Sequence, residues 1–461
     1  MKQTWNAELQ RRDFLKLSAM GGALWMLPQL PSLALADIED PHFFVQIYYS
    51  GGVDVSYLFD ARRLAMKEAK YIHNYLNTDP QVWSGTRSGQ TFATTVVDKL
   101  KPHASDFSVL NGVVMAHAFD GHAENMKFAF SGNPFGGEAF IPHLNKVGVK
   151  EPLDGVSSTA ATFGITNLNL TNFNSTVPLS VDSASALVKG LKAKPPLDLQ
   201  SRMLKFVNMR LMANSQGTGQ FSEGSKGMAQ ALQAGPDLVN RLREVEPPMG
   251  NKSFLPIMAQ LFKKHITKSV ILEYGNPEFV FDAHAPTDCK NQPVALAKAM
   301  DKVVELIQFL KATPYDQTRS LYDLTTFMVT SEFGRSMRQK DKGMDETGTD
   351  HNPLANSVLV GGKGIRGGMV IGASDFQTPT EALSGAHLEI DRDKLRTMGR
   401  PFDFSTMQDR EDKPMRFDIK DYLSFSSIVN TIYSSYGVST QLYRTIDRNG
   451  TVAPILRGLL S

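Results

Sequence analysis

Cysteine is nearly missing from this chain, which has one, Cys289, among its 461 residues. A single cysteine cannot form an internal disulfide, so the stability of the fold must come from its hydrophobic core and from any ions that it binds. Long apolar runs are scarce as well. The run between Leu17 and Leu30 is too short, and too interrupted by glycine and proline, to span a bilayer well.

An excess of charge of either sign is also missing. The chain has 49 Lys and Arg against 47 Asp and Glu, and its first 36 residues hold four and two of these, which leaves 45 of each sign in residues 37–461. A basic excess is the electrostatic mark of proteins that bind nucleic acid or anionic lipid. We therefore expect neither of them as a partner.

The first 36 residues have the three zones of an export signal. A basic zone contains Arg11-Arg12 in an Arg-Arg-x-Phe-Leu-Lys pattern, an apolar run follows, and Ala34-Leu35-Ala36 supplies a small-x-small cleavage site. This order predicts a twin-arginine signal peptide over residues 1–36, in preference to a membrane anchor. We expect the twin-arginine translocase to carry the folded chain to the periplasm, where it begins at Asp37 and has no stable membrane anchor.

Apolar runs alternate with helical patterns in residues 37–461. Buried strands are expected at residues 42–49, 107–116, 268–274, 279–281 and 325–330. Helices are expected at Val294–Leu310, where apolar residues recur at helical spacing, and near Asp421–Tyr436. Strands alternating with helices predict an α/β domain with a mostly parallel sheet flanked by helices.

Two other segments have distinct patterns. Residues of about 185–265 are rich in Leu, Met, Lys, Arg and Gln and contain a Ser/Gly patch, which predicts an inserted helical cap. Ser357 to Gly372 consists of an apolar run, a Gly-rich turn and a second apolar run, which predicts a hairpin.

Acidic residues and histidines follow the predicted strands in four places, and a fifth group, with Asp350 and His351, precedes the predicted hairpin. The candidate metal ligands and catalytic residues are Asp54, His122, Asn125, Asp282, His284, Glu332, Arg335, Asp350 and His351. Ligands of open parallel sheets bind at the carboxyl ends of the strands, so these segments should converge. Carboxylates with neutral imidazoles are ligands for zinc, manganese and related ions, and two such ions can clamp an ester during displacement.

Each of these residues also has an ordinary structural interpretation. Asp54 is alternatively a helix cap, His122 a hydrogen-bonded residue at a helix start, and Asp350 a turn residue. Glu332 is alternatively paired with Arg335 in a structural ion pair. Asp282 and His284 are a stronger signal, because residues two apart in an extended segment face the same way.

The order of the motifs resembles a known family. The leader, Gly-Gly-x-Asp54, Phe-Asp282-x-His284, Ser-Glu332-Phe-Gly-Arg335 and Gly-Thr-Asp350-His351 are similar to a broad family of twin-arginine-exported bacterial proteins of unknown function. That family is grouped with the alkaline phosphatase and sulfatase superfamily. The resemblance spans nearly the whole chain, is diffuse in the expected cap, and is most specific at Ser-Glu-Phe-Gly-Arg and Thr-Asp-His.

The resemblance implies an alkaline phosphatase-like fold with one or two divalent ions (zinc, manganese or calcium). Asp54, His122 and Glu332 would hold one ion, and Asp282, His284 and His351 the other. Asp350 would orient His351 or add a ligand. The implied activity is hydrolysis of a phosphate or sulfate ester in a pocket covered by the cap.

The chain also departs from the superfamily pattern. No Ser, Thr or Cys occurs between Ala116 and Phe130, where the nucleophile belongs, and Phe333 stands where a phosphatase usually has a histidine. We expect water activated by the metal to attack, with His122 as ligand, general acid or base, or nucleophile as the alternatives. Arg335, and with it Asn125, would contact the anion, unless Arg335 forms a salt bridge to an acid.

A non-catalytic role is the competing hypothesis. The missing hydroxyl or thiol nucleophile favours an exported protein that serves in envelope assembly or binds a partner. An open coordination position on a bound metal would favour an enzyme, and a closed one a structural role.

Overall fold

The computed structural model describes residues 40–61, 71–72, 81–82, 92–93, 95–115, 121–133, 144, 160–164, 176–179, 254–265, 268–275, 278–336, 338–339, 348–376, 397–410, 421–438 and 452–461. The predicted signal peptide and most of the predicted cap lie outside these residues. The chain divides into two compact units. The first comprises residues 1–39, 145–162 and 168–268, and the second comprises residues 40–144, 163–167 and 269–461.

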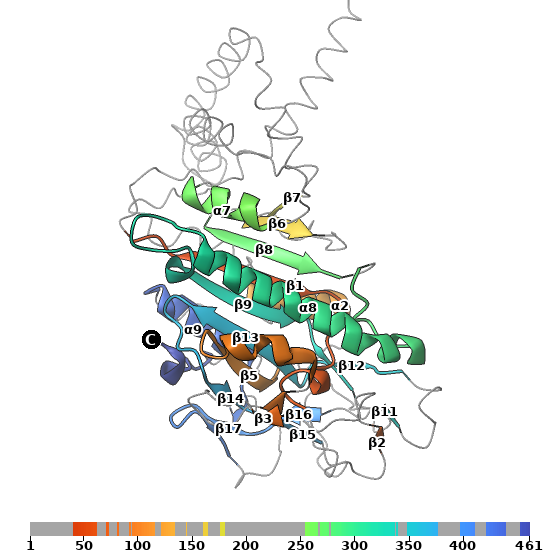
Figure 1. Ribbon diagram of the computed structural model, residues 1–461. Helices are drawn as coiled ribbons and strands as arrows, with labels where there is room; N and C mark the ends of the chain where they lie inside the picture. Colours follow the sequence, from red (N-terminus) through yellow and green to blue (C-terminus); the bar gives the residue numbers. More distant parts are fainter. Residues whose placement is uncertain are drawn as a thin grey trace, which may run out of the picture. The chain divides into compact units, whose positions relative to one another are not determined.

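The second unit is built on a central sheet (Figure 1). Its strands follow in the order β14 (Val370–Ile371), β5 (Phe107–Val113), β13 (Asn356–Gly362), β9 (Thr325–Ser331), β1 (Phe43–Tyr49) and β8 (Ser269–Tyr274). β1 pairs in parallel with both of its neighbours, β8 and β9, and β14 pairs in parallel with β5. β13 is antiparallel to β5 and β9. The unit is a mixed α/β fold with a largely parallel sheet.

β1 has the sequence expected of a strand in the middle of such a sheet. All seven of its residues, Phe-Phe-Val-Gln-Ile-Tyr-Tyr, are buried. Strands that are covered on both faces become near-continuous apolar runs rather than alternating ones. β5 and β9 are buried along their whole length as well, which agrees with the runs that predicted them.

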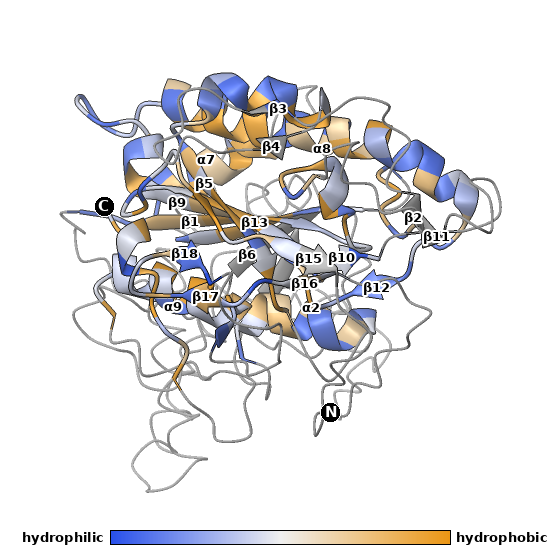
Figure 2. Ribbon diagram, turned by 90° about the horizontal axis from the view of Figure 1, so that it is seen from below, coloured by the Kyte–Doolittle hydropathy of each residue, from blue (hydrophilic) through white to orange (hydrophobic). Residues whose placement is uncertain are grey.

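Helices cover both faces of this sheet. α8 (Pro286–Ala312) lies on one face, and α2 (His122–Ser131) and α9 (Phe425–Ser435) lie on the other (Figure 2). α8 buries residues at helical spacing, among them Leu296, Met300, Val303 and Leu310. Ser424 caps the start of α9, and its side chain accepts a hydrogen bond from the backbone N–H of Ser427.

Two sequence predictions about strands were wrong. β13 and β14 do not form a hairpin, because each pairs with β5, on opposite sides of it. The glycine-rich link crosses closely over the chain just before β5: a Cβ at Gly361 or Gly367 would lie 2.3 Å or 2.1 Å from the backbone oxygens of Asp106 and Ser105. Phe279 and Phe281 are buried, but residues 279–281 form no strand.

The remaining elements are short. β7 (Thr176–Leu179) and α7 (Leu255–Lys263) belong to the first unit, and α7 lies within the predicted cap. β6 (Ala160–Gly164) has residues in both units. The others are η2 (Val55–Tyr57), β2 (Tyr71–Ile72), β3 (Gln81–Val82), β4 (Phe92–Ala93), η4 (Thr95–His103), η6 (Tyr322–Leu324), β10 (Gly334–Arg335), β11 (Arg338–Gln339), β12 (His351–Asn352), β15 (Ser374–Phe376), β16 (Thr397–Gly399), β17 (Phe402–Asp403), β18 (Gln408–Asp409) and η8 (Arg457–Leu459). Among the described helices, none has the length and apolar character needed to cross a membrane.

Candidate metal centre

Five separate segments meet where the parallel strands end, and four of them supply polar side chains. Glu332 directly follows β9, and the turn at Gly51 and Gly52 follows β1. The segment after β8 brings Asp282 and His284, α2 begins at His122, and β12 carries His351. β12 pairs with β10, so that His351 lies opposite Arg335. Strand ends therefore position the site, as the sheet topology predicts.

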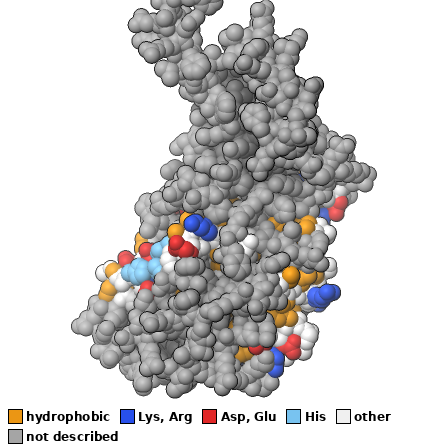
Figure 3. All heavy atoms as spheres, turned by 180° about the vertical axis from the view of Figure 1, so that it is seen from behind, with side chains coloured by type: hydrophobic (Ala, Val, Ile, Leu, Met, Phe, Trp, Pro, Cys, Tyr) orange, Lys and Arg blue, Asp and Glu red, His pale blue; other side chains and the backbone are white. Residues whose placement is uncertain are grey.

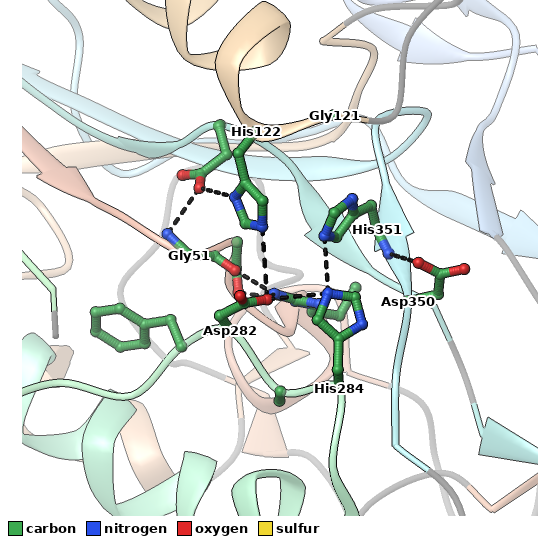
Figure 4. Close-up of polar contacts among 12 residues, drawn as sticks. Gly51, Gly121, His122, Asp282, His284, Asp350 and His351 are labelled. Carbon is green, nitrogen blue, oxygen red and sulfur yellow. Dashed lines mark hydrogen bonds and ion pairs between the residues drawn. The ribbon is translucent and has the colours of Figure 1, made fainter. Parts of the chain in front are cut away.

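Four of these side chains form one compact cluster. His122, Asp282, His284 and His351 each offer a ligand atom, and these atoms all lie within 4.8 Å of one another. His284 Nε2 is 2.9 Å from His351 Nε2 and 3.1 Å from Asp282 Oδ1, which is also 3.6 Å from His122 Nε2 (Figure 4). We call these four residues the His3Asp cluster.

The His3Asp cluster fits a single metal ion. In a tetrahedral site with bonds of about 2.0–2.1 Å, ligand atoms are ~3.3 Å apart. Three of the six separations in the cluster are 2.9 Å, 3.1 Å and 3.6 Å, and all six are within 4.8 Å. Two imidazole Nε2 atoms at 2.9 Å also need a proton or a cation between their lone pairs. Imidazole with carboxylate suits zinc, manganese, iron and nickel better than calcium, which prefers oxygen ligands.

The cluster is open to solvent. The side chain of His284 is 49% exposed, and those of His122 and Asp282 are 39% and 36% exposed. Figure 3 shows histidine side chains gathered at the surface of one face, next to acidic ones. A solute can therefore reach an ion held there.

Glu332 lies behind the cluster and fixes the orientation of His122. It is buried, and its Oε1 accepts hydrogen bonds from His122 Nδ1 at 2.9 Å and from the backbone N–H of Gly51 at 2.7 Å. Its Oε2 accepts from the Tyr48 hydroxyl at 2.9 Å. A carboxylate on Nδ1 leaves Nε2 free to bind a metal, which is the usual arrangement behind a metal-binding histidine.

The acids also determine the protonation of His122 in the ion-free chain. Contacts with the carboxylates of Asp282 and Glu332 raise the pKa of His122 to about 9. Burial acts to raise the pKa of Asp282, but the contacts with His122 and Arg335, with their charges, outweigh it and hold this pKa well below its usual range. Without a metal, a protonated His122 would be held between the carboxylates of Asp282 and Glu332.

A pair of hydrogen bonds ties the loop of Asp282 and His284 to the strand of His351. The buried carbonyl of Ala283 accepts from the backbone N–H of Thr349 at 2.9 Å and from its hydroxyl at 2.8 Å. The Cys289 thiol donates to the same carbonyl at 3.3 Å. The sequence analysis missed the role of Thr349, although it is part of the Gly-Thr-Asp-His motif.

The guanidinium of Arg335 donates hydrogen bonds to other residues of the protein. Its side chain has no exposed surface, and its guanidinium donates to Asp282 Oδ1, to the carbonyl of Gly51, and to that of Gly52 at 3.2 Å. Of the two interpretations from sequence, the geometry shows the salt bridge, and Nη1 of the guanidinium has no hydrogen-bond partner among the described residues. The partner is Asp282 rather than Glu332.

Besides Glu332 and Arg335, three predicted site residues lie outside the cluster. Asp54 caps η2, where its Oδ1 accepts from the backbone N–H and hydroxyl of Ser56 at 3.0 Å and 2.6 Å. Asn125 is buried in α2 and donates to the carbonyl of Gly121 at 2.9 Å. Asp350 accepts from the backbone N–H of His351 at 2.8 Å, and its carboxylate lies on the side of His351 away from the cluster (Figure 4).

The expected division into two ligand sets is therefore not what the geometry favours. His122, expected with Asp54 and Glu332, lies with Asp282, His284 and His351 instead. The reason is local, since Asp54 accepts a hydrogen bond from Ser56, and Glu332 accepts one from His122 Nδ1.

One buried acid near the site was missed. Glu273 in β8 lies beside Tyr48 in the sheet register, and both of its carboxyl oxygens lack a hydrogen-bond partner among the described residues. Burial, and after it the charge of Glu332, raises the pKa of Glu273 to about 8. No periodicity marks such a residue, because it occupies one position in an otherwise ordinary strand.

The chain has distant likenesses among solved structures. One is Ps i-CgsB in complex with k-i-k-neocarrahexaose, with 10% identity and a TM-score of 0.30, over 90% of this chain and 75% of the other. Another is a 2-O GAG sulfatase, with 10% identity and a TM-score of 0.31, over 91% of this chain and 75% of the other. Both likenesses are too distant to assign an activity.

Sequence comparison matches one part of the chain to a family. No curated protein sequence matches the chain. Residues 213–393 match the model of one family, described as a protein of unknown function (DUF1501), and this segment contains Asp282, His284, Glu332, Arg335 and His351.

Proposed function

We propose that this chain is an exported protein that binds one divalent metal ion in the His3Asp cluster and hydrolyses a phosphate or sulfate ester there. The observation that carries the proposal is the meeting of four ligand atoms within 4.8 Å at an exposed edge of the sheet. When bound, a divalent ion supplies Lewis-acid chemistry, because it polarises an ester oxygen and lowers the pKa of water towards neutrality.

The charge of the centre favours an anionic substrate. A divalent ion and the Arg335 guanidinium together carry three positive charges, against two negative charges on Asp282 and Glu332, the carboxylates in direct contact with the cluster. The histidines are neutral when they bind a metal. The net positive charge attracts a phosphate or sulfate group.

The protein residues around the cluster have separate tasks. Glu332 keeps the proton of His122 on Nδ1, so that Nε2 points into the cluster. Arg335 keeps Asp282 ionised and fixed in orientation. Such groups act by holding ligands in place before the substrate arrives.

Metal content and ester turnover test the proposal together. The protein is loaded with Zn²⁺, Mn²⁺ or Ca²⁺ and assayed with phosphomonoesters, phosphodiesters and sulfate esters. We expect turnover with one ester class that depends on the metal and is lost in His351→Ala. His103→Ala is the matched control, because His103 pairs with Asp106 outside the cluster. Absence of metal-dependent turnover with every ester class would reject the hydrolase.

A second candidate is a structural metal site in a non-catalytic exported protein. Four protein ligands complete a tetrahedral zinc site, which then has no open position for a substrate. X-ray absorption of the metal-loaded protein separates the two candidates. Four-coordinate metal without water favours the structural role, and five or six ligands including water favour the enzyme.

A further inference from the structure

We propose that Arg335 stands in for a second metal ion, and that its permanent charge limits the centre to one divalent ion. The inference rests on the metal site of the proposed function but does not depend on hydrolysis. An arginine suits this role because its guanidinium stays charged at every relevant pH.

The surroundings of the guanidinium resemble those of a bound cation. Its three acceptors are all oxygens, namely a carboxylate oxygen of Asp282 and the carbonyl oxygens of Gly51 and Gly52. Carboxylate and backbone carbonyl oxygens are also the ligands of hard metal ions. The guanidinium thus occupies the place that an ion next to Asp282 would need.

Two glycines make room for this arrangement. Gly51 and Gly52 have positive φ angles of 122° and 78°, which turn the end of β1 sharply towards the guanidinium. A Cβ on Gly51 would lie 2.8 Å from the backbone nitrogen of Asp282, and one on Gly52 would lie 2.2 Å from the ring of Phe333. The Gly-Gly pair therefore lets β1 approach both Asp282 and Arg335.

Two other acids near the site, Asp54 and Glu332, already have hydrogen-bond donors. Asp54 accepts from Ser56, and Glu332 accepts from His122, Gly51 and Tyr48. A second divalent ion would have to displace Arg335 or break these hydrogen bonds. With Arg335 in place it would also add two positive charges to a centre that already has a net positive charge, and charges a few ångströms apart in a partly buried site repel strongly.

The number of bound ions tests the inference. Mn²⁺ binding is measured by calorimetry and elemental analysis for the whole protein, for Arg335→Ala and for Arg335→Lys. We expect one ion per chain in the parent protein and in Arg335→Lys, which keeps the charge. In Arg335→Ala we expect a second Mn²⁺, because the three oxygens are left without a cation. Arg319→Ala is the matched control, since it removes an arginine–aspartate pair at the surface and should leave the number at one.

A second measurement uses guanidinium itself. At low millimolar concentration, guanidinium chloride should raise the melting temperature of Arg335→Ala relative to NaCl at the same ionic strength, and should not do so in the parent protein. Two ions in the parent protein would overturn the role of Arg335 and leave the metal site intact, and this holds even if Arg335→Ala fails to fold. A folded Arg335→Ala with one ion and no response to guanidinium would overturn it too. A parent protein that binds no ion would reject the centre itself, whereas one ion without turnover would reject hydrolysis alone.

Discussion

His122 Nδ1 and Glu332 Oε1 are 2.9 Å apart, although 210 positions separate the two residues in the chain. Through this bond the end of β9 determines how the first residue of α2 faces the cluster. Glu332 is buried while His122 is partly exposed, so the pair joins the core of the sheet to its surface.

Replacement of Glu332 with Gln tests the orientation of His122. The amide keeps the size of the side chain but removes the charge that makes His122 a stronger ligand. We expect metal affinity to fall by about 10- to 100-fold, the usual effect of losing a carboxylate behind a metal-binding histidine. Calorimetric titration with Zn²⁺ or Mn²⁺ measures this, with Glu305→Gln on the exposed side of α8 as the control. Equal affinities in the two variants would mean that Glu332 has a packing role only.

Glu273 should make stability depend on pH. The pKa of this carboxyl is about 8 in the fold, because of burial and the charge of Glu332, and it is near 4.5 as a model value. Between these values the unfolded chain releases the proton and the folded chain keeps it. The free energy of unfolding therefore falls as pH rises from about 4.5 to 8, by up to ~1.4 kcal/mol per pH unit from this residue.

Glu273→Gln removes this dependence. We expect the variant to be more stable than the parent by a few kcal/mol at pH 8 and by much less at pH 5, in urea unfolding at both values. Glu305→Gln, which changes an exposed acid, should shift stability equally at the two pH values. A Glu273→Gln effect that is the same at pH 5 and pH 8 would show that this carboxyl titrates normally in the fold.

Thr349→Val tests the tie between the two ligand-bearing segments. Valine keeps the shape but loses the hydroxyl that donates to the carbonyl of Ala283. We expect a loss of about 1 kcal/mol in stability, together with weaker metal binding, because His284 and His351 are held less firmly. Thr313→Val is the matched control, since its hydroxyl makes a similar bond to Phe309 at the other end of α8. It should lower stability without changing metal affinity.

The sheet could be predicted because its signal is local. β1, β5, β8 and β9 are short apolar runs, and helical spacing indicated α8. The hairpin prediction failed because pairing of β13 and β14 with β5 depends on segments more than 200 residues away. Local sequence contains no information on which strand will lie between two others.

Part of the candidate centre was predictable because its residues lie next to strands that local sequence indicates. Strand ends indicated that Asp282, His284 and His351 would approach one another, and the topology brings them together. Asp54 accepts a hydrogen bond from Ser56, two residues later. This spacing is a known capping signal, but the sequence analysis gave more weight to a role of Asp54 as a metal ligand. The burial of Arg335 and the role of Glu273 follow only from packing across the sheet.

His284→Ala is the sharpest test of the His3Asp cluster, because its side chain is half exposed and its loss should cost the ion-free fold little. In the parent protein, Mn²⁺ or Zn²⁺ at 100 times its dissociation constant should stabilise the fold by about 2.7 kcal/mol and raise the melting temperature. His284→Ala should unfold at the same temperature as the parent without metal and should gain little when the same metal is added. His103→Ala should keep the full gain, since His103 pairs with Asp106 outside the cluster. An equal gain in all three proteins would place the ion elsewhere, whereas a gain lost in His284→Ala alone requires that this imidazole bind it.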